Sequence, residues 1–133
     1  MKKAFRFIAS FCLLTVIVLT TSCATQKSAS VNTSSETYRF ATYKAVLENS
    51  MFDADKAVRA MGRRAKYVEV ARYNKYDHID YVFRDFNDNK FSIRLTAIAP
   101  EQTRIEIKIG KFGSKSASQE ILVAIDEELR SAE

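Results

Sequence analysis

Apolar and polar residues alternate strictly in two segments of the C-terminal half of the chain. From residue 91 to 97, Phe, Ile, Leu and Ala alternate with Ser, Arg and Thr, and from 103 to 109 Ile alternates with Arg, Glu and Lys. A period of two predicts strands with one buried and one solvated face, which is typical of an antiparallel sheet. Residues 66–73 and 78–86 repeat the pattern less regularly, so four consecutive strands are predicted. Short, turn-prone links suited to hairpins join them: Asn74-Lys75, Asn87-Asp88-Asn89 and Pro100-Glu101-Gln102.

One earlier strand and two helices complete the predicted elements. Residues 38–47 (YRFATYKAVL) are rich in β-branched and aromatic side chains and predict a strand. Ser50 followed by Asp53 predicts a helix start, with Asp where Glu or Gln is more usual. Ser116 and Gln119 predict a capping box for a second helix up to Ala132. The apolar stripes of the two helices are Ala54, Ala57, Val58, Met61 and Ala65 in the first and Ala117, Ile121, Ala124, Ile125 and Leu129 in the second.

These elements follow one another in the order β-α-β-β-β-β-α. The two amphipathic helices have one place to bury their stripes, which is the apolar face of the sheet. We therefore predict a two-layer α+β sandwich, with a mostly antiparallel five-stranded sheet that carries both helices on one face. This single α+β domain is predicted to span residues 37–133, an ordinary domain size.

The first 22 residues have the features of a signal peptide. Lys2, Lys3 and Arg6 precede a 13-residue apolar run, FIASFCLLTVIVL, at residues 7–19. This run is shorter than the roughly 20 apolar residues that a membrane-spanning helix needs, so we predict that residues 1–22 are removed. Removal leaves 18 of the 21 basic residues against 16 acidic ones, a net charge of +2. A nearly neutral chain lacks the basic excess of nucleic-acid-binding proteins, and no nucleic-acid partner is expected.

Cys23 ends the stretch LTTSC, which resembles the lipobox of bacterial lipoproteins. In such signals the cysteine receives a diacylglycerol group and becomes the first residue after cleavage. The match is imperfect, because Thr20 stands where Leu is usual and Leu19 lies one place too early. Ordinary secretion with cleavage after Ala24 and an uncleaved anchor are the alternatives. Because Cys12 would leave with the signal peptide, Cys23 has no disulfide partner, and acylation would consume its thiol.

Residues 23–36 are predicted to form an acylated cysteine and a flexible tether. The sequence from 24 to 36, ATQKSASVNTSSE, is rich in Ser and Thr and has no aromatic residue, so it cannot bury enough surface to fold. A diacylglycerol and a further acyl chain on Cys23 would hold the protein durably at a membrane. The resemblance implies the outer membrane, facing the periplasm, rather than the inner one, because Ala24 and not Asp follows the cysteine.

His78, the single histidine, and the segment Asp85-x-Asn87-x-Asn89 are the candidates for metal binding. Asp77 and His78 are consecutive at a strand start, so they are predicted to point to opposite faces. The second segment imitates the opening of a calcium loop, but Lys90 and Thr96 occupy the places where that loop needs Gly and Glu. We predict a hairpin turn there and no metal site.

Two basic features could contact an anion or a membrane. Gly110-Lys111-Phe112-Gly113 precedes the second helix, whose N-terminus could hold an anion, although the phosphate-loop pattern is incomplete. We predict instead a tight turn with Phe112 buried in the core. The outer face of the first helix could meet anionic headgroups or remain a solvated face. The candidate residues are Lys56, Arg59, Arg63, Arg64, Lys66 and Lys115.

No catalytic residue and no cofactor are predicted. A Ser-His-Asp arrangement needs a histidine oriented by a buried acid, and His78 has no evident serine partner. The sequence also lacks the Gly-x-Ser-x-Gly pattern of a nucleophile turn. We therefore expect a protein that is not an enzyme.

The stretch TRIEIKIGKFGSKSASQEIL, from Thr103 to Leu122, resembles an uncharacterised family of short bacterial lipoproteins, one of the domain-of-unknown-function families. That family has a Thr-x-Ile-x-Ile-x-x-Gly-x-Phe-Gly segment that leads into its last helix. Members often have Asp after the second glycine, where this chain has Ser114, so a role that needs a carboxylate there is in doubt. The matching residues are Thr103, Ile105, Ile107, Gly110, Phe112, Gly113, Ser118, Ile121 and Leu122.

Together these observations predict a cell-envelope lipoprotein that acts as a non-catalytic binding or interaction module. Its partner would be an envelope protein or a lipid. One alternative is a small carrier of a lipid or other apolar ligand, held between a curved sheet and its helices. Another is an exported soluble protein, cleaved after Ala24.

Overall fold

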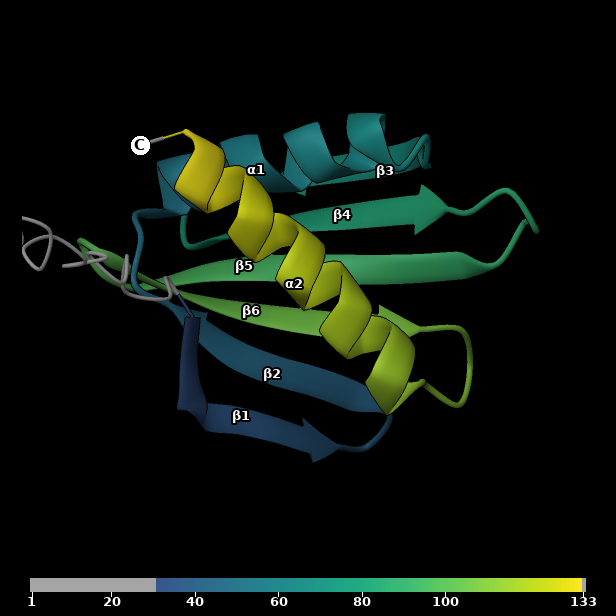
Figure 1. Cartoon of the computed structure of the whole chain (residues 1–133), viewed down its shortest axis with the longest axis horizontal. Coiled ribbons are helices and arrows are strands. Elements are labelled where there is room, and N and C mark those ends of the chain that lie inside the picture. The colour runs from purple at the N-terminus through teal and green to yellow at the C-terminus, as the bar shows by residue number, and fades with distance from the viewer. Residues whose placement is uncertain (1–30, 133) are drawn as a thin grey trace, which may run out of the picture.

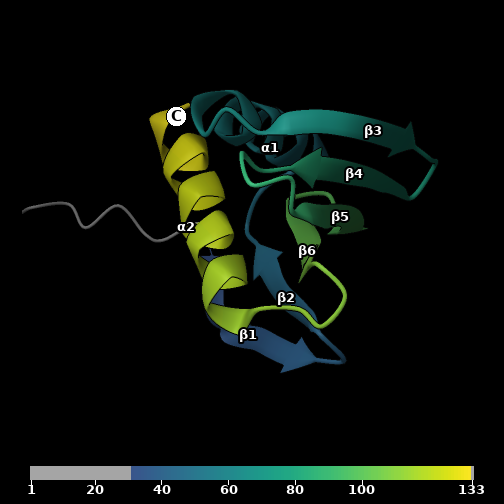
Figure 2. The ribbon, with the colours of Figure 1, turned by 90° about the vertical axis from the view of Figure 1, so that its right-hand side faces the viewer.

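The alternating segments pair into one antiparallel sheet, as their period of two predicted. The computed structural model describes residues 31–132, and over this range six strands lie in the order β1-β2-β6-β5-β4-β3 (Figure 1). Both helices cover the same face of this twisted sheet (Figure 2). The elements are β1 (Val31–Arg39), β2 (Thr42–Leu47), α1 (Met51–Arg64), β3 (Val68–Asn74), β4 (His78–Arg84), β5 (Lys90–Ala99), β6 (Gln102–Ile109) and α2 (Lys115–Ser131).

The sheet has one strand more than predicted, because residues 38–47 do not form a single strand. The chain reverses at Phe40 and Ala41, whose φ angles are 50° and 61°, so that β1 pairs with β2 from Arg39 opposite Thr42 onward. Two-residue hairpin turns with positive φ at both positions favour Asn-Gly or similar pairs. The pair Phe-Ala is no turn signal, and the hairpin therefore escaped prediction.

Strand β1 also overlaps the predicted tether, 23–36. From Val31 on, the chain is part of β1 rather than a linker, with a bulge between Asn32 and Thr37. An edge strand can form without burying apolar side chains, since its backbone groups bond to the neighbouring strand. The predicted signal peptide, Cys23 and the start of the tether lie outside the described residues.

The core forms where the helices meet the sheet. Ile79, Tyr81 and Phe83 of β4 are buried as predicted, and the strands β5 and β6 bury their predicted sides up to Leu95 and Ile107. Other predicted positions lie outside the core: Val68 and Val70 on the edge strand β3 are 62% and 48% exposed, and Ala65 and Ala97 are also exposed. The core also contains Tyr43, Ala45, Leu47, Ala54, Ala57, Val58, Met61, Phe91, Ile93, Ile105, Ile121, Leu122, Ile125 and Leu129.

The two helix starts are set by serine caps. The Ser50 side chain accepts a hydrogen bond from the backbone N–H of Asp53 at 3.2 Å, as predicted for α1. Helix α2 begins earlier than predicted, because Ser114 and not Ser116 is its cap. The Ser114 hydroxyl accepts from the N–H of Ala117 at 3.4 Å, and its backbone carbonyl accepts from the buried Ser118 hydroxyl at 2.7 Å.

The connection from β6 to α2 packs directly on the β1–β2 turn. Gly110 and Gly113 both have positive φ, and a Cβ on Gly113 would lie 2.4 Å from the Ala41 carbonyl oxygen and 2.6 Å from the Tyr38 hydroxyl. The predicted tight turn is confirmed, but the predicted burial of Phe112 is wrong, since its side chain is 83% exposed. The backbone of Gly113, rather than the ring of Phe112, fills the space beside the hairpin.

Replacing Gly113 by alanine is expected to destabilise the fold much more than the same change at Gly110. Both substitutions put a Cβ on a left-handed backbone, which costs about 1 kcal/mol. Only at Gly113 does the new methyl group also collide with backbone, whereas nothing lies within 4 Å at Gly110. The additional loss at Gly113 is about 1–3 kcal/mol. Urea denaturation of both variants measures the difference, and equal losses would contradict the close approach.

Candidate functional site

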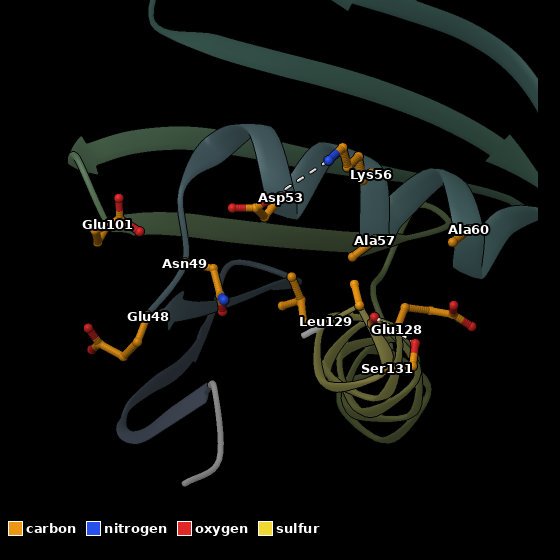
Figure 3. Close-up of a pocket in the computed structure, with 11 residues that line it drawn as sticks. Glu48, Asn49, Asp53, Lys56, Ala57, Ala60, Glu101, Glu128, Leu129 and Ser131 are labelled. Carbon is orange, nitrogen blue, oxygen red and sulfur yellow. Dashed lines mark hydrogen bonds and ion pairs between the residues drawn. The ribbon is translucent and has the colours of Figure 1, made fainter. Parts of the chain in front are cut away.

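A pocket of about 640 Å³ opens between the two helices. Helix α1 and the C-terminal turns of α2 form two of its walls, and the β2–α1 connection and the β5–β6 turn complete it (Figure 3). Its apolar surface comes from Ala57, Ala60 and Leu129. Four carboxylates surround this surface: Glu48, Asp53, Glu101 and Glu128.

The pocket is acidic although two cations lie nearby. Lys56 is 4.0 Å from Asp53, and Glu128 pairs with Arg64 at 2.8 Å. Glu48 accepts a hydrogen bond from the Gln102 side chain at 2.8 Å. Such a lining accepts hydrogen bonds from positively charged or polar groups, and it does not suit a hydrocarbon chain.

A buried ion cluster lies behind α1. Asp55 is 5% exposed; its carboxylate accepts a hydrogen bond from the Tyr81 hydroxyl and pairs with Arg72 at 2.8 Å and Arg59 at 2.9 Å. Burial, followed by the hydrogen bond to Asp55, raises the pKa of Tyr81 above its usual range. Arg72 also donates to the Tyr81 hydroxyl at 3.0 Å. The cluster fixes α1 to β3 and β4, and its groups are bound to one another rather than presented to a ligand.

The sheet face opposite the two helices carries a row of alternating charges. The strand register aligns Lys44, Glu106, Arg94 and Asp80 across β2, β6, β5 and β4. Lys44 lies 2.7 Å from Glu106, and Arg94 donates to Asp80 at 2.6 Å and 3.1 Å. The hydrogen bond from Arg94 holds the pKa of Asp80 below its usual value. This row stabilises the register of the four strands.

The six basic residues that were predicted to contact a membrane or an anion fall into two groups, those with an acidic neighbour and those without an ion pair. Arg59 pairs with Asp55, Arg64 pairs with Glu127 and Glu128, and Lys56 faces Asp53. The remaining three form no ion pair within the described part of the chain, so the outer face of α1 is not a continuous basic surface. These three are Arg63, Lys66 and Lys115.

The predicted metal candidates form polar contacts with neighbouring residues. Asp77 lies in the β3–β4 turn, and its carboxylate approaches His78 Nδ1 at 2.7 Å, so the prediction that the two side chains point apart is wrong. The backbone is not yet extended at Asp77, and the alternation rule does not apply there. Asp85 accepts from the N–H groups of Asn87 and Asn89 at 2.8 Å and 2.9 Å, which confirms the hairpin turn.

Residues 31–132 contain no group of three or more His, Cys, Asp or Glu side chains placed to hold a metal ion. Within that range, neither helix is long and apolar enough to span a membrane. Cys23 is outside the described residues, so its acylation stays a prediction.

Sequence reasoning missed two features of the molecule. Asp55 was not recognised as buried, although it lies directly beside Ala54 in the apolar stripe of α1 and one helical turn before Val58 and Arg59. Three phenylalanines at turns were also missed, because apolar side chains are expected in cores. The burial of Asp55 could have been suspected from its position beside the apolar stripe of α1. The exposure of the three phenylalanine rings could not have been predicted from the sequence.

The fold and the pocket define a two-layer α+β domain with an open acidic hollow between its helices. The chain belongs to the family described as Protein of unknown function (DUF3568), which matches residues 6–128. The match includes the whole sheet and all but the end of α2. This confirms that the chain is a member of a domain-of-unknown-function family. No curated protein matches the chain.

Replacing Asp55 by alanine is expected to destabilise the domain by about 3 kcal/mol, because Tyr81 would lose its hydrogen-bond partner and Arg72 its counter-charge near the core. The matched control is Glu127→Ala, since Glu127 is also paired with an arginine but is 55% exposed. An exposed pair contributes about 0–1 kcal/mol. Urea denaturation measures both, and a similar loss in the two variants would contradict the structural role of Asp55.

Acid is expected to weaken the fold partly through Asp80. Its pKa is lower in the folded chain than in the unfolded chain, where it is about 3.9. The resulting stabilisation is complete above the unfolded pKa and is lost as the pH falls through the folded pKa. The free energy of unfolding should therefore drop below about pH 4, and drop less in Asp80→Asn.

Urea denaturation over a pH series tests this dependence. Glu101→Gln is the control, because Glu101 is an exposed carboxylate on the β5–β6 turn. The pKa values of Asp77, bonded to His78, and of Asp85, bonded to Asn89, are lowered too, so Asp80→Asn should reduce the acid loss without removing it. An unchanged pH profile in Asp80→Asn would contradict the prediction.

Proposed function

We propose that this protein is a bacterial cell-envelope lipoprotein, anchored through Cys23, whose domain is a non-catalytic binding module. The anchor would be a diacylglycerol and an acyl chain, and the membrane the outer one, facing the periplasm. The observation that carries the proposal is the order of the first 23 residues. A positive segment and a 13-residue apolar run precede a cysteine that would remain as the only one in the mature chain.

The binding role is supported by how the polar residues of the domain are used. Asp55, His78, Asp80 and Asp85, which are the groups best suited to acid–base chemistry, each make contacts that hold strands, turns or a helix together. They do not converge on the pocket between the helices. A module that recognises a partner needs no such convergence, whereas an enzyme does.

A carrier of apolar ligands is the less favoured alternative. The space between sheet and helices is filled, since side chains such as Leu47, Ile93 and Ile125 are 0% exposed there. The pocket of Figure 3 is open and lined by carboxylates. Hydrocarbon chains bind in mostly apolar cavities, so a partner with polar or cationic groups fits this pocket better.

Labelled fatty acid is expected to be incorporated into the wild-type protein and not into Cys23→Ala, which should also leave the membrane fraction. Cys12→Ala is the matched control, because Cys12 lies within the apolar run and should be removed with it. Autoradiography of the purified protein reads out the label. Incorporation into Cys23→Ala, or its loss in Cys12→Ala, would overturn the anchor.

Mass spectrometry of the same purified protein separates a binding module from a carrier. A module should carry no lipid beyond its covalent anchor. Stoichiometric lipid released by organic solvent from Cys23→Ala would instead establish the carrier function and refute the proposed one.

A further inference from the structure

Three phenylalanine side chains are exposed at three turns of the domain. Phe40 in the β1–β2 turn is 96% exposed, Phe86 in the β4–β5 turn 88%, and Phe112 in the β6–α2 connection 83%. Each exposed ring lacks the stabilisation of about 1.5–3 kcal/mol that full burial of a phenylalanine side chain contributes. None of the three contributes to the core, so the packing of the domain gives no reason for their positions.

The three turns lie at the same end of the sheet (Figure 1), and this end faces the viewer in Figure 2. The contact between Gly113 and Ala41 joins the β6–α2 connection to the β1–β2 turn. The N–H of Gly110 donates to the Lys90 carbonyl at 2.9 Å, which joins the same connection to the β4–β5 hairpin. The aromatic tips therefore form one surface, which we call the aromatic end.

The aromatic end is basic. Lys90, Lys108 and Lys111 are exposed beside the three rings and form no ion pair with the described residues. The Lys111 ammonium lies 5.8 Å from the centre of the Phe112 ring. The carboxylates of the β4–β5 turn do not cancel this charge fully. Asp88 pairs with Arg84 at 2.6 Å, and Asp85 alone adds one negative charge against the three lysines.

The β1–β2 turn holds its phenylalanine at a conformational cost. Phe40 has a φ of 50°, a left-handed conformation that is unfavourable for a bulky side chain. Asn-Gly would form such a turn with less strain. A strained turn that also exposes a ring offers the folded domain no advantage of its own, and strain of this kind is characteristic of functional positions.

We propose that the aromatic end is a membrane-docking surface that inserts Phe40, Phe86 and Phe112 into the interface of an anionic bilayer. Phenylalanine side chains can be buried at the boundary between lipid headgroups and acyl chains, where lysines can reach the phosphates. Three separate rings on protruding turns suit a deformable lipid surface better than a protein partner, which would need a continuous complementary patch. This docking goes beyond the proposed anchor and does not depend on Cys23.

Vesicle sedimentation tests the docking with the full chain carrying Cys23→Ser, so that no acyl chain contributes. The probes are vesicles with phosphatidylglycerol and vesicles of phosphatidylcholine alone. We expect binding to the anionic vesicles to weaken about tenfold for each of Phe40→Ser, Phe86→Ser and Phe112→Ser. Replacing Lys90, Lys108 and Lys111 together by Gln should weaken it about a hundredfold, because each lysine contributes independently near a charged surface.

The opposite end of the domain supplies the matched controls. Tyr76→Ser removes a fully exposed ring from the β3–β4 turn, and Lys75→Gln removes a charge beside it. Both should bind vesicles like the parent chain. An equal loss of vesicle binding for variants at the two ends, or unchanged binding of the three phenylalanine variants, would overturn the proposal.

A site-specific label separates docking from insertion of the N-terminal apolar run. In a chain with Cys12 and Cys23 replaced by Ser, a fluorophore is attached at Phe86→Cys or at Tyr76→Cys. A lipid-borne quencher should reduce the emission at position 86 and not at 76. Quenching of position 76 alone, or of neither, refutes the proposal.

The double variant Phe40→Asn/Ala41→Gly excludes misfolding as the cause of weak binding. Because Asn-Gly relieves the strained turn, this variant should unfold at a higher urea concentration than the parent chain. It should nevertheless bind anionic vesicles about tenfold less tightly, since one inserted ring is missing. A stabilised variant that binds as tightly as the parent contradicts a role for Phe40.

Discussion

The structure depends on one constraint: both helices must cover the same face of the sheet. The sheet has a single apolar face, formed by alternate residues of its strands, and the two stripes of α1 and α2 are the only described surfaces that cover it. The opposite face is covered by no layer formed by residues 31–132 (Figure 2). It is therefore built from polar pairs across the strands, with Lys44, Glu106, Arg94 and Asp80 in one row.

The same constraint explains the buried ion cluster. Strand β3 lies at the edge of the sheet and is mostly exposed. Arg72 reaches from this edge, donates to Tyr81 and pairs with Asp55 of α1. These polar contacts hold α1 against the edge of the sheet, where apolar contacts are few. Removing Asp55 would leave its buried hydrogen-bonding neighbours without a partner.

The predictable part of the fold is the part that obeys local periodicity. Residues 91–97 and 103–109 alternate because each strand has one wet face, and their burial followed from the sequence. The β1–β2 turn could not be predicted, because Phe40 and Ala41 adopt a conformation that their own preferences oppose. Contacts with the β6–α2 connection hold the turn in place, and these contacts are distant in sequence.

The candidate sites were less predictable than the fold, because ion pairing is a tertiary property. Helical spacing predicts that Lys56, Arg59 and Arg63 share one helix face, with Arg64 close by, and gives no sign that Arg59 pairs with the buried Asp55. It could not reveal that Arg64 meets Glu127 and Glu128, more than 60 residues away in the chain. Three cations that form no ion pair with the described residues, Lys90, Lys108 and Lys111, lie beside the aromatic turns. Hydrophobicity predicts burial of the rings there and gives no reason to expect their exposure.

The two ends of the domain restrict how it could sit on a membrane. Val31 pairs with Leu47 near the acidic pocket, whereas Arg39, next to Phe40, pairs with Thr42 at the other end of the hairpin. The two ends are five residues of β2 apart, or about 17 Å. The eight residues that lead from Cys23 to Val31 can span at most about 29 Å. Because this reach exceeds the separation of the two ends, an anchor at Cys23 lets the aromatic end reach the same bilayer both with the strands along its surface and with the domain upright.

Charge, rather than reach, distinguishes the two upright orientations of the domain. Anionic headgroups would repel the end that carries Glu48, Asp53 and Glu101, and would attract the lysines of the aromatic end. An upright domain with its anchored, acidic end against the bilayer is thus the least favourable arrangement. The remaining arrangements place the aromatic end on the anchoring membrane, with the domain upright or lying along it, or on a second anionic surface.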